Sequence, residues 1–325
     1  MLEKVHDFIK NNRKFVITSH VNPDGDSIGS EIALYKYLIK QGKQVSIINY
    51  SKTPDNYLFL DKSNIIQQFD ENRHEQPINE ADVIFILDTN EYSRLRTMSP
   101  VIQSSTAKKV CIDHHLGSSN GFDYYVSDTG SPSTGEILYK LFRMNDSGSI
   151  NSEIAVPLYT AIMTDTGSFR FPRTDSETHR ITAELIDRGA DPVSIFSEVY
   201  DKAPLGRLKL LSRFLNNFKT AYDNKLIYAH INVDDFEETG TNVFDTEGFS
   251  HYLMSINTVQ ISIIFTQTPR GVKMSFRSKG NIYVNELAKE FGGGGHMNAA
   301  GAWVDNPDIN KLTEEVISKS EKYIT

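Results

Sequence analysis

Short apolar runs alternate with helical patterns through the first half of the chain, and this alternation constrains the fold more than any other feature. The candidate strands are residues 15–17, 45–48, 83–87 and 110–112. A helix is predicted from about Ser27 to Gln41, where Gly42 ends it. Because residues 83–87 are apolar throughout, both faces of that strand should be buried. Strands alternating with helices predict right-handed crossovers and an α/β fold with a doubly wound parallel sheet.

The pattern changes in the second half of the chain. Helical patterns over residues 135–218, punctuated by prolines, precede candidate strands at 225–233, 258–265 and 271–277. The last two strands are expected to form a hairpin around residues 269–271, and helices near 283–291 and 309–323 complete a smaller α/β unit. A length of 325 residues accommodates two domains. We therefore expect a first domain over residues 1–190, a helical linker over 191–215 and a second domain over 216–325.

Composition argues against several classes of protein. Hydrophobic residues at 39% and charged residues at 23% are close to globular averages, which argues against a disordered or fibrous chain. No apolar stretch approaches the length of a membrane span, and charges interrupt any signal-peptide pattern near the N-terminus. The single cysteine, Cys111, favours a cytoplasmic location. A net charge of −8 argues against a general duplex-DNA binder, but metal ions can offset the charge of small phosphate-rich substrates.

Acidic and histidine residues follow three candidate strands at the points where those strands end. The set comprises His20, Asp24 and Asp26 after the first strand, Asp88 after the third, Asp113, His114 and His115 after the fourth, and Asp165 in a helical pattern. The carboxyl ends of parallel strands meet at one edge of a sheet, where α/β proteins bind ligands. Several ionised carboxylates share such a space only if cations compensate them. Mixed carboxylate and imidazole ligands favour Mn²⁺, Fe²⁺ or Co²⁺ over Ca²⁺.

Each of these segments has a structural explanation when it is considered alone. An aspartate after a strand is most often a turn former or a helix cap, and Pro23-Asp24-Gly25 is typical of a turn. Cys111 lies in an apolar run and is expected to be a core residue. Four carboxylate-bearing segments, three of them at strand ends, are nevertheless hard to attribute to turns alone. The joint pattern favours a metal site.

A glycine-rich segment in the second half indicates a phosphate-binding element. Its members are Gly293, Gly294, Gly295 and His296. Consecutive glycines allow the backbone to approach a ligand and point N–H groups at phosphate oxygens. Arg277 and Ser278 end a candidate strand, and a guanidinium can hold phosphate through two hydrogen bonds. A flexible loop after a helix explains the glycines equally well when they are considered alone. Together with the metal site, they predict a substrate cleft between the two domains.

These motifs together resemble those of the DHH/DHHA1 phosphoesterase family, over nearly the whole chain and in the expected order. The resemblance is carried by His20-x-x-x-Asp24-x-Asp26, Asp88, Asp113-His114-His115, Asp165 and Gly293-Gly294-Gly295-His296. The compact length is most similar to the NrnA-like oligoribonucleases (nanoRNases), which also dephosphorylate 3′-phosphoadenosine 5′-phosphate (pAp) and whose relatives hydrolyse the dinucleotide pApA. The resemblance implies that the first domain is a catalytic DHH domain and that the second is a substrate-binding DHHA1 domain.

The resemblance also implies a role for each residue. One Mn²⁺ would be held by His20, Asp24 and Asp88, and a second by Asp26, Asp88, His114 and Asp165, with Mg²⁺, Co²⁺ or Fe²⁺ as substitutes. Asp113 would orient its neighbours, and His115 would face the scissile phosphate. Substrate would be held by Arg277, Ser278 and the glycine segment through His296. Water activated by the two ions would attack phosphorus in line, removing one mononucleotide at a time from very short RNA.

Two other functions stay open. A family II inorganic pyrophosphatase shares the DHH-type metal domain, although the adjacent arginine and lysines of its second domain are not found in this sequence. A non-catalytic nucleotide-binding module would bind without metal and show no turnover. The expected partners are short single-stranded RNA and small phosphorylated nucleotides, with neither duplex DNA nor a membrane among them. The family resemblance is compatible with a homodimer.

Overall fold

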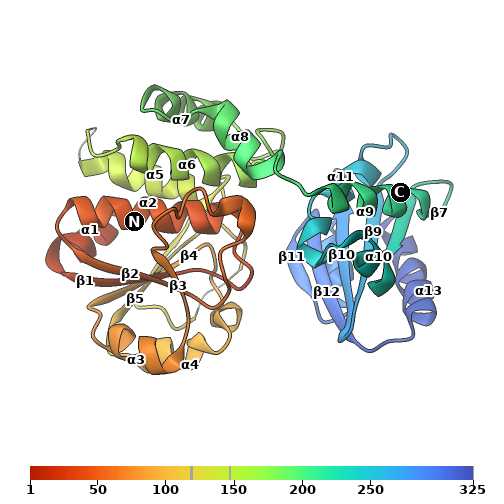
Figure 1. Cartoon of the computed structure of the whole chain (residues 1–325), viewed down its shortest axis with the longest axis horizontal. Helices are drawn as coiled ribbons and strands as arrows, with labels where there is room; N and C mark the ends of the chain where they lie inside the picture. Colours follow the sequence, from red (N-terminus) through yellow and green to blue (C-terminus); the bar gives the residue numbers. More distant parts are fainter. Residues whose placement is uncertain (118–119, 146–147, 325) are drawn as a thin grey trace. The chain divides into compact units, whose positions relative to one another are not determined.

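A computed structural model of the protein describes residues 1–117, 120–145 and 148–324. The chain divides into two compact units, Met1–Lys202 and Ala203–Thr325 (Figure 1). Helix α8 (Pro192–Tyr200) belongs to the first unit, and helix α9 (Leu205–Asn216) belongs to the second. The two units are each built on a six-stranded sheet.

The sheet of the first unit is parallel between every pair of neighbouring strands. Its strands are β1 (Lys14–Thr18), β2 (Gln44–Asn49), β3 (Ile66–Gln68), β4 (Val83–Leu87), β5 (Lys108–Asp113) and β6 (Tyr124–Ser127). The spatial order β3-β2-β1-β4-β5-β6 reverses direction between β1 and β4, so the predicted doubly wound sheet is confirmed. The sequence did not predict β3 and β6, because each is a short edge strand without a continuous apolar run.

Helices cover both faces of this sheet (Figure 1). One side carries α1 (Leu2–Asn11), α2 (Gly25–Lys40), α5 (Thr134–Asn145) and α6 (Ser152–Asp165), and α7 (Ser176–Asp187) and α8 pack beyond α6. The other side carries α3 (Glu71–Asn79) and α4 (Met98–Ser104). Two short 3₁₀ helices are η1 (Asp55–Tyr57) and η2 (Tyr92–Leu95). Successive apolar residues of β4 point to opposite faces of the sheet, so a layer of helices must bury each face. Phe85 lies in the core under α2, whereas Ile84 and Ile86 lie in the core under α3 and α4.

The sheet of the second unit is mixed. Its strands are β7 (Lys219–Ala221), β8 (Leu226–Ile231), β9 (Ile261–Thr268), β10 (Gly271–Ser278), β11 (Gly294–His296) and β12 (Ala299–Asp305), in the spatial order β11-β12-β10-β9-β8-β7. Strands β9 and β10 form the predicted hairpin. The expectation that the glycine-rich segment is a loop is wrong for Gly294–His296, which pairs with β12 as an edge strand. Glycines lack the alternating side chains from which a strand is recognised.

The second unit also carries helices on both faces of its sheet. Helices α9, α10 (Val233–Thr239) and α11 (Phe249–Met254) enclose one core, and α12 (Val284–Lys289) and α13 (Ile309–Ser320) enclose another; η3 (Val243–Thr246) and η4 (Glu321–Tyr323) are short 3₁₀ helices. Strand β10 buries Val272, Met274 and Phe276 in the core of α12 and α13. Its alternate residues therefore lie on the opposite face. Within the described residues of both units, no helix has the length and apolar character needed to cross a membrane.

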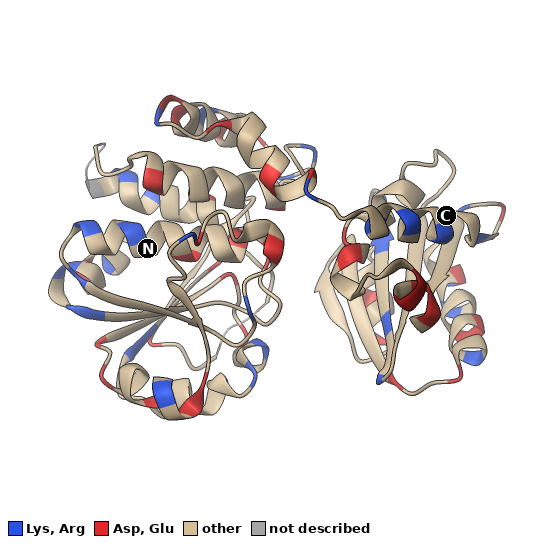
Figure 2. Cartoon of the chain, viewed as in Figure 1, with Lys and Arg blue, Asp and Glu red and all other residues tan. Residues whose placement is uncertain are grey.

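Charged residues of both signs are interspersed along the elements of each unit (Figure 2). In the second unit, helix α10 is acidic and carries Asp234 and Asp235 in its first turn. Strand β10, by contrast, carries Lys273 and Arg277 on the face opposite its buried residues. The second unit therefore presents two cations from one strand, although the whole chain is acidic.

Candidate metal centre

The candidate ligands come from the carboxyl edge of the first sheet. His20 lies two residues after β1 and Asp88 directly follows β4, and these two strands flank the point where the strand order reverses. Asp113 is the last residue of β5 and is followed by His114 and His115. In a doubly wound sheet, the loops that follow the two strands flanking this point run in opposite directions and leave a crevice between them, and ligands bind in that crevice. The topology thus gathers residues that are far apart in the sequence.

Two helix N-termini provide hydrogen bonds to Asp24 and Asp26. Oδ1 of Asp24 accepts hydrogen bonds from the backbone N–H groups of Asp26 and Ser27, both at 3.1 Å, so Asp24 is the N-cap of α2. Asp26 lies in the first turn of α2. Its carboxylate also accepts hydrogen bonds from the backbone N–H groups of Thr134 (2.7 Å) and Gly135 (2.9 Å), which begin α5. The positive ends of two helices therefore stabilise this carboxylate and fix its position.

Asp88 is the central residue of the cluster. Its side chain is buried, and its backbone has a left-handed φ of 59°, which few non-glycine residues adopt. Oδ2 of Asp88 accepts a hydrogen bond from Ser27 Oγ (2.7 Å) and lies 3.2 Å from His20 Nε2. Oδ1 lies 3.5 Å from His114 Nε2. A single carboxylate therefore has an imidazole beside each of its oxygens.

The nitrogen and oxygen atoms of the cluster form three overlapping groups, and within each group they lie within 4.8 Å of one another. His20 Nε2 lies 3.8 Å from Asp24 Oδ2, and His114 Nε2 lies 3.4 Å from Asp165 Oδ2. Two ligands about 2.1 Å from one ion are separated by roughly 3–3.5 Å. The 3.4 Å spacing lies in this range and the 3.8 Å spacing is slightly wider, so small side-chain movements would bring both pairs onto divalent cations. The groups are His20–Asp24–Asp88, Asp26–His114–Asp165 and Asp88–His114–His115.

The electrostatics of the cluster also fit a bound cation. Burial raises the pKa of Asp26 well above its usual range, and the charge of Asp88 adds to the effect. Burial likewise raises the pKa of Asp165 to about 7. Although burial lowers the pKa of His114, the hydrogen bond to Asp88 and the neighbouring carboxylates raise it to about 10. Protons or metal ions must therefore neutralise the concentrated negative charge of this site.

Asp113 and His115 form a pair beside the metal-ligand groups. Nδ1 of His115 lies 2.7 Å from Oδ1 of Asp113, which is completely buried. The carboxylate favours the tautomer with a proton on Nδ1 and holds the imidazole in one orientation. The side chain of His115 is 24% exposed, whereas that of His114 is 2% exposed. Of the two histidines, His115 is therefore the one accessible to a substrate.

The sequence interpretation missed Ser27 and the N-terminus of α5 as parts of this centre. Ser27 Oγ lies 2.8 Å from His20 Nε2 as well as 2.7 Å from Asp88 Oδ2, and it links these two side chains. Thr134 follows Ser131, Pro132 and Ser133, a composition typical of a helix start. That signal predicts the helix but not its contact with Asp26, because the contact depends on how α2 and α5 pack.

In the second unit, strand register places two of the candidate substrate-binding residues on one face of the sheet. Ala299 pairs with Arg277 on one side and with His296 on the other. Directly paired residues point to the same face. Arg277 and His296 are thus two strands apart on one face, separated by about 9–10 Å. The Arg277 face is defined by Lys273, Ser275 and Arg277 of β10, Ala299, Gly301 and Trp303 of β12, and Gly294 and His296 of β11.

Ser278 lies at the end of β10, and its hydroxyl makes hydrogen bonds within the following turn. Its Oγ donates to the carbonyl oxygen of Ile282 and accepts a hydrogen bond from Asn298 Nδ2 (3.0 Å). The same amide donates to the carbonyl oxygen of Gly280 (3.0 Å). These bonds connect the turn after β10 to the β11–β12 hairpin. A substrate contact of Ser278 stays a prediction.

The glycines in β11 and directly before it have different steric environments. A Cβ on Gly293 would lie 2.1 Å from the carbonyl oxygen of Gly301, and a Cβ on Gly295 would lie 2.6 Å from that of Ala299. Gly295 also has a φ of 140°, which side-chain-bearing residues rarely adopt. A Cβ on Gly294 would meet no atom within 4 Å. Close approach to β12 therefore requires Gly293 and Gly295, whereas Gly294 borders open space on the Arg277 face.

We expect alanine to be tolerated at Gly294 and not at Gly295. Gly294→Ala should change the free energy of unfolding by less than about 0.5 kcal/mol, because the new methyl group meets no neighbour. Gly295→Ala should cost roughly 1–3 kcal/mol or more, because it combines backbone strain with a steric clash. Chemical denaturation of the two variants and the wild type measures the difference. Equal destabilisation by both substitutions would contradict the steric assignment.

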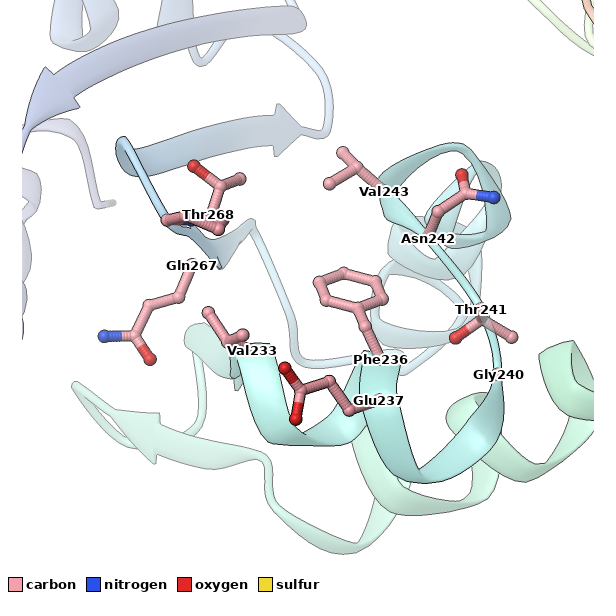
Figure 3. A pocket seen from close by; sticks show the side chains of 10 residues that line it. Val233, Phe236, Glu237, Gly240, Thr241, Asn242, Val243, Gln267 and Thr268 are labelled. Atoms are coloured by element: carbon pink, nitrogen blue, oxygen red, sulfur yellow. The ribbon is translucent and has the colours of Figure 1, made fainter.

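A cavity of about 350 Å³ lies elsewhere in the second unit, beside α10 and the end of β9 (Figure 3). Val233, Phe236 and Val243 line it, and the ring of Phe236 points into the space between them. Among the described residues that line the cavity, Glu237 is the one with an ionisable side chain. The cavity therefore lacks the grouped ligands and cations that phosphate chemistry needs, and the metal centre is the stronger candidate site.

Comparison with known proteins identifies the class and then the family. Residues 14–162 match the model of the DHH family, N-terminal domain, and residues 223–323 match the model of the DHHA1 domain. The fold, the ligand cluster and these matches define a hydrolase that acts on phosphoric ester bonds. The chain belongs to the DHH/DHHA1 phosphoesterase family, which confirms the resemblance indicated by its motifs.

Three relatives cover most of the chain. The bifunctional oligoribonuclease and PAP phosphatase NrnA of Thermus thermophilus is 29% identical over 95% of this chain and 90% of its own length. The protein of the same name from Bacillus subtilis is 27% identical over 88% of each chain. Among solved structures, an exopolyphosphatase-related protein from Bacteroides fragilis is 33% identical, with a TM-score of 0.93 over 98% of this chain and 96% of its own.

Proposed function

We propose that this protein hydrolyses short oligoribonucleotides, including pApA, to mononucleotides and converts pAp to AMP, with two Mn²⁺ ions as cofactors. The observation that carries the proposal is the carboxylate of Asp88, which is shared between a ligand group containing His20 and one containing His114. The names of the Thermus and Bacillus relatives support the two substrate classes. Mixed imidazole and carboxylate ligands favour Mn²⁺ over the all-oxygen sites that bind Ca²⁺.

The proposed ligand sets overlap at one residue. Bound cations would supply Lewis acidity to the phosphoryl oxygens and lower the pKa of the attacking water. His115, whose Nδ1 lies 2.7 Å from Asp113 Oδ1, would face the scissile phosphate and, with a proton on both ring nitrogens, would donate a hydrogen bond from Nε2 to a non-bridging oxygen. Arg277 and His296 would hold a second phosphate of the substrate. One ion would be held by His20, Asp24 and Asp88, and the other by Asp26, Asp88, His114 and Asp165.

Product release from a panel of substrates tests the proposal. The panel contains pAp, pApA, an RNA trimer, inorganic pyrophosphate and inorganic polyphosphate, each incubated with Mn²⁺ or with EDTA. We expect Mn²⁺-dependent release from the three nucleotide substrates and none in EDTA. Polyphosphate is included because of the name of the Bacteroides relative. Turnover of pyrophosphate alone would indicate a pyrophosphatase, and absence of turnover on every substrate would indicate a non-catalytic binding module.

Substrate length provides a further expected result. We expect the RNA trimer to be hydrolysed with a higher kcat/KM than a single-stranded RNA of about 25 nucleotides, and we expect mononucleotides to appear one at a time. The reason proposed is that binding groups close to the scissile phosphate contact only the first few nucleotides. Product chromatography over a time course measures both quantities. Equal kcat/KM values for the two RNAs would overturn this part of the proposal.

A further inference from the structure

Trp303, the one tryptophan of the chain, lies on the Arg277 face. It pairs directly with Lys273 of β10, whereas its neighbours Ala302 and Val304 pack in the core on the opposite face. Its side chain is 43% exposed. An aromatic side chain of this size is therefore accessible on the same face of the sheet as Arg277.

The indole of Trp303 is held in place from two directions. Its Nε1–H group donates a hydrogen bond to Asp305 Oδ1 at 2.7 Å. A Cβ on Gly271 would lie 3.0 Å from Cζ2 of the indole, so the ring packs closely against the backbone of β10 where that strand has no side chain. These contacts limit the motion of the ring while leaving much of it exposed. A ring fixed before binding loses little conformational entropy when a planar ligand stacks on it.

Small side chains separate Trp303 from Arg277. Ser275 and Gly301 pair with each other midway along the face, between the Lys273–Trp303 pair and the Arg277–Ala299 pair. Lys273 and Arg277 are four residues apart on one strand, a distance of roughly 13–14 Å. Along β10 and β12 the face therefore has a cation at each end, an aromatic ring beside one of them and small side chains between them, while the carboxylate of Glu247 lies close enough to affect the pKa of both cations.

We propose that Trp303 stacks on a base of the oligoribonucleotide substrate and that Lys273 contacts a phosphate beside that base, at least one nucleotide away from the phosphate held by Arg277. Every base has a π face, so this subsite would distinguish substrates by their number of nucleotides and not by the identity of the base. Its distance from Arg277 exceeds the roughly 3.4 Å rise of one stacked nucleotide several-fold. A substrate with one base, such as pAp, would leave it empty. The inference rests on the proposed oligoribonuclease activity and assigns Trp303 and Lys273 as residues that favour RNA over pAp.

Steady-state kinetics with Mn²⁺ test this subsite. Trp303→Ala should raise KM for the RNA trimer by about 5- to 100-fold, the range that corresponds to the loss of one base–aromatic stack. KM and kcat for pAp should stay unchanged, and Trp303→Phe should recover most of the trimer KM because it keeps an aromatic face. Phe218→Ala is the matched control, since Phe218 is also 43% exposed but precedes β7 at the opposite edge of the sheet.

Fluorescence gives a readout independent of turnover, because Trp303 is the sole tryptophan. The His115→Ala variant, which keeps every proposed metal ligand, would be titrated with the trimer or with pAp in Mn²⁺. We expect saturable quenching by the trimer and no quenching by pAp. An unchanged trimer KM in Trp303→Ala, with wild-type hydrolysis of the trimer intact, would overturn the subsite and leave the proposed function standing. Absence of trimer hydrolysis by the wild type would overturn both.

Discussion

Replacement of Asp88 by asparagine is expected to lower kcat/KM for pAp by on the order of 10³-fold or more. Asp88 is common to two of the three ligand groups, and its oxygens lie 3.2 Å from His20 Nε2 and 3.5 Å from His114 Nε2. An uncharged amide at this position removes the negative charge that both cation positions share. Binding of Mn²⁺, measured by isothermal titration calorimetry, should weaken in parallel with the loss of activity.

Asp187→Asn provides the matched control for this substitution. Asp187 is the exposed last residue of α7 in the same unit, so its replacement makes the same chemical change away from the ligand cluster. We expect the control to keep wild-type activity and Mn²⁺ affinity. Circular dichroism should show that both variants are folded. Retention of full activity and full Mn²⁺ affinity by Asp88→Asn would contradict the shared-ligand assignment.

The metal-free protein is expected to lose stability as the pH rises from 5 to 9. The pKa of Asp165 is raised by burial from 3.8 to about 7, so ionising this carboxyl disfavours the folded state progressively between pH 4 and 7. The pKa of His114 is raised from 6.5 to about 10, so its stabilising contribution is complete below pH 6.5 and is lost as the pH rises to 10. Both effects have the same sign, and together they should lower Tm by on the order of 5–10 °C.

Thermal denaturation in EDTA and in Mn²⁺, across this pH range, measures the effect. Mn²⁺ should raise Tm, and it should do so more at pH 9 than at pH 5, because metal binding requires deprotonated ligands and stabilises only the folded state. Asp165→Asn is the informative variant, since it removes the carboxyl whose pKa is raised to about 7 and should flatten the EDTA profile below pH 7. A Tm in EDTA that rises between pH 5 and 9 would show that the cluster is not the dominant titrating site.

The sequence was most informative where one residue type recurs with a clear pattern. Residues 83–87 are apolar at every position, and the structure buries β4 on both faces. Asp88 stands out because it directly follows that run. Short edge strands gave no comparable signal, and β3, β6, β7 and β11 were missed for that reason. The inner strand β12 was also missed. Gly293 and Gly295 are explained by close contact with β12, a contact that neither segment reveals alone.

The amino-acid sequence by itself determined the doubly wound sheet and the candidate ligands, because alternating hydrophobicity and acidic residues at strand ends are local patterns. Only the tertiary structure decided which atoms meet. The amides of Thr134 and Gly135 reach Asp26, and Ser27 joins His20 to Asp88, because helices α2 and α5 begin at the same edge of the sheet. Strand register likewise placed Trp303 on the face of Arg277, since a shift of one residue would turn its side chain into the core.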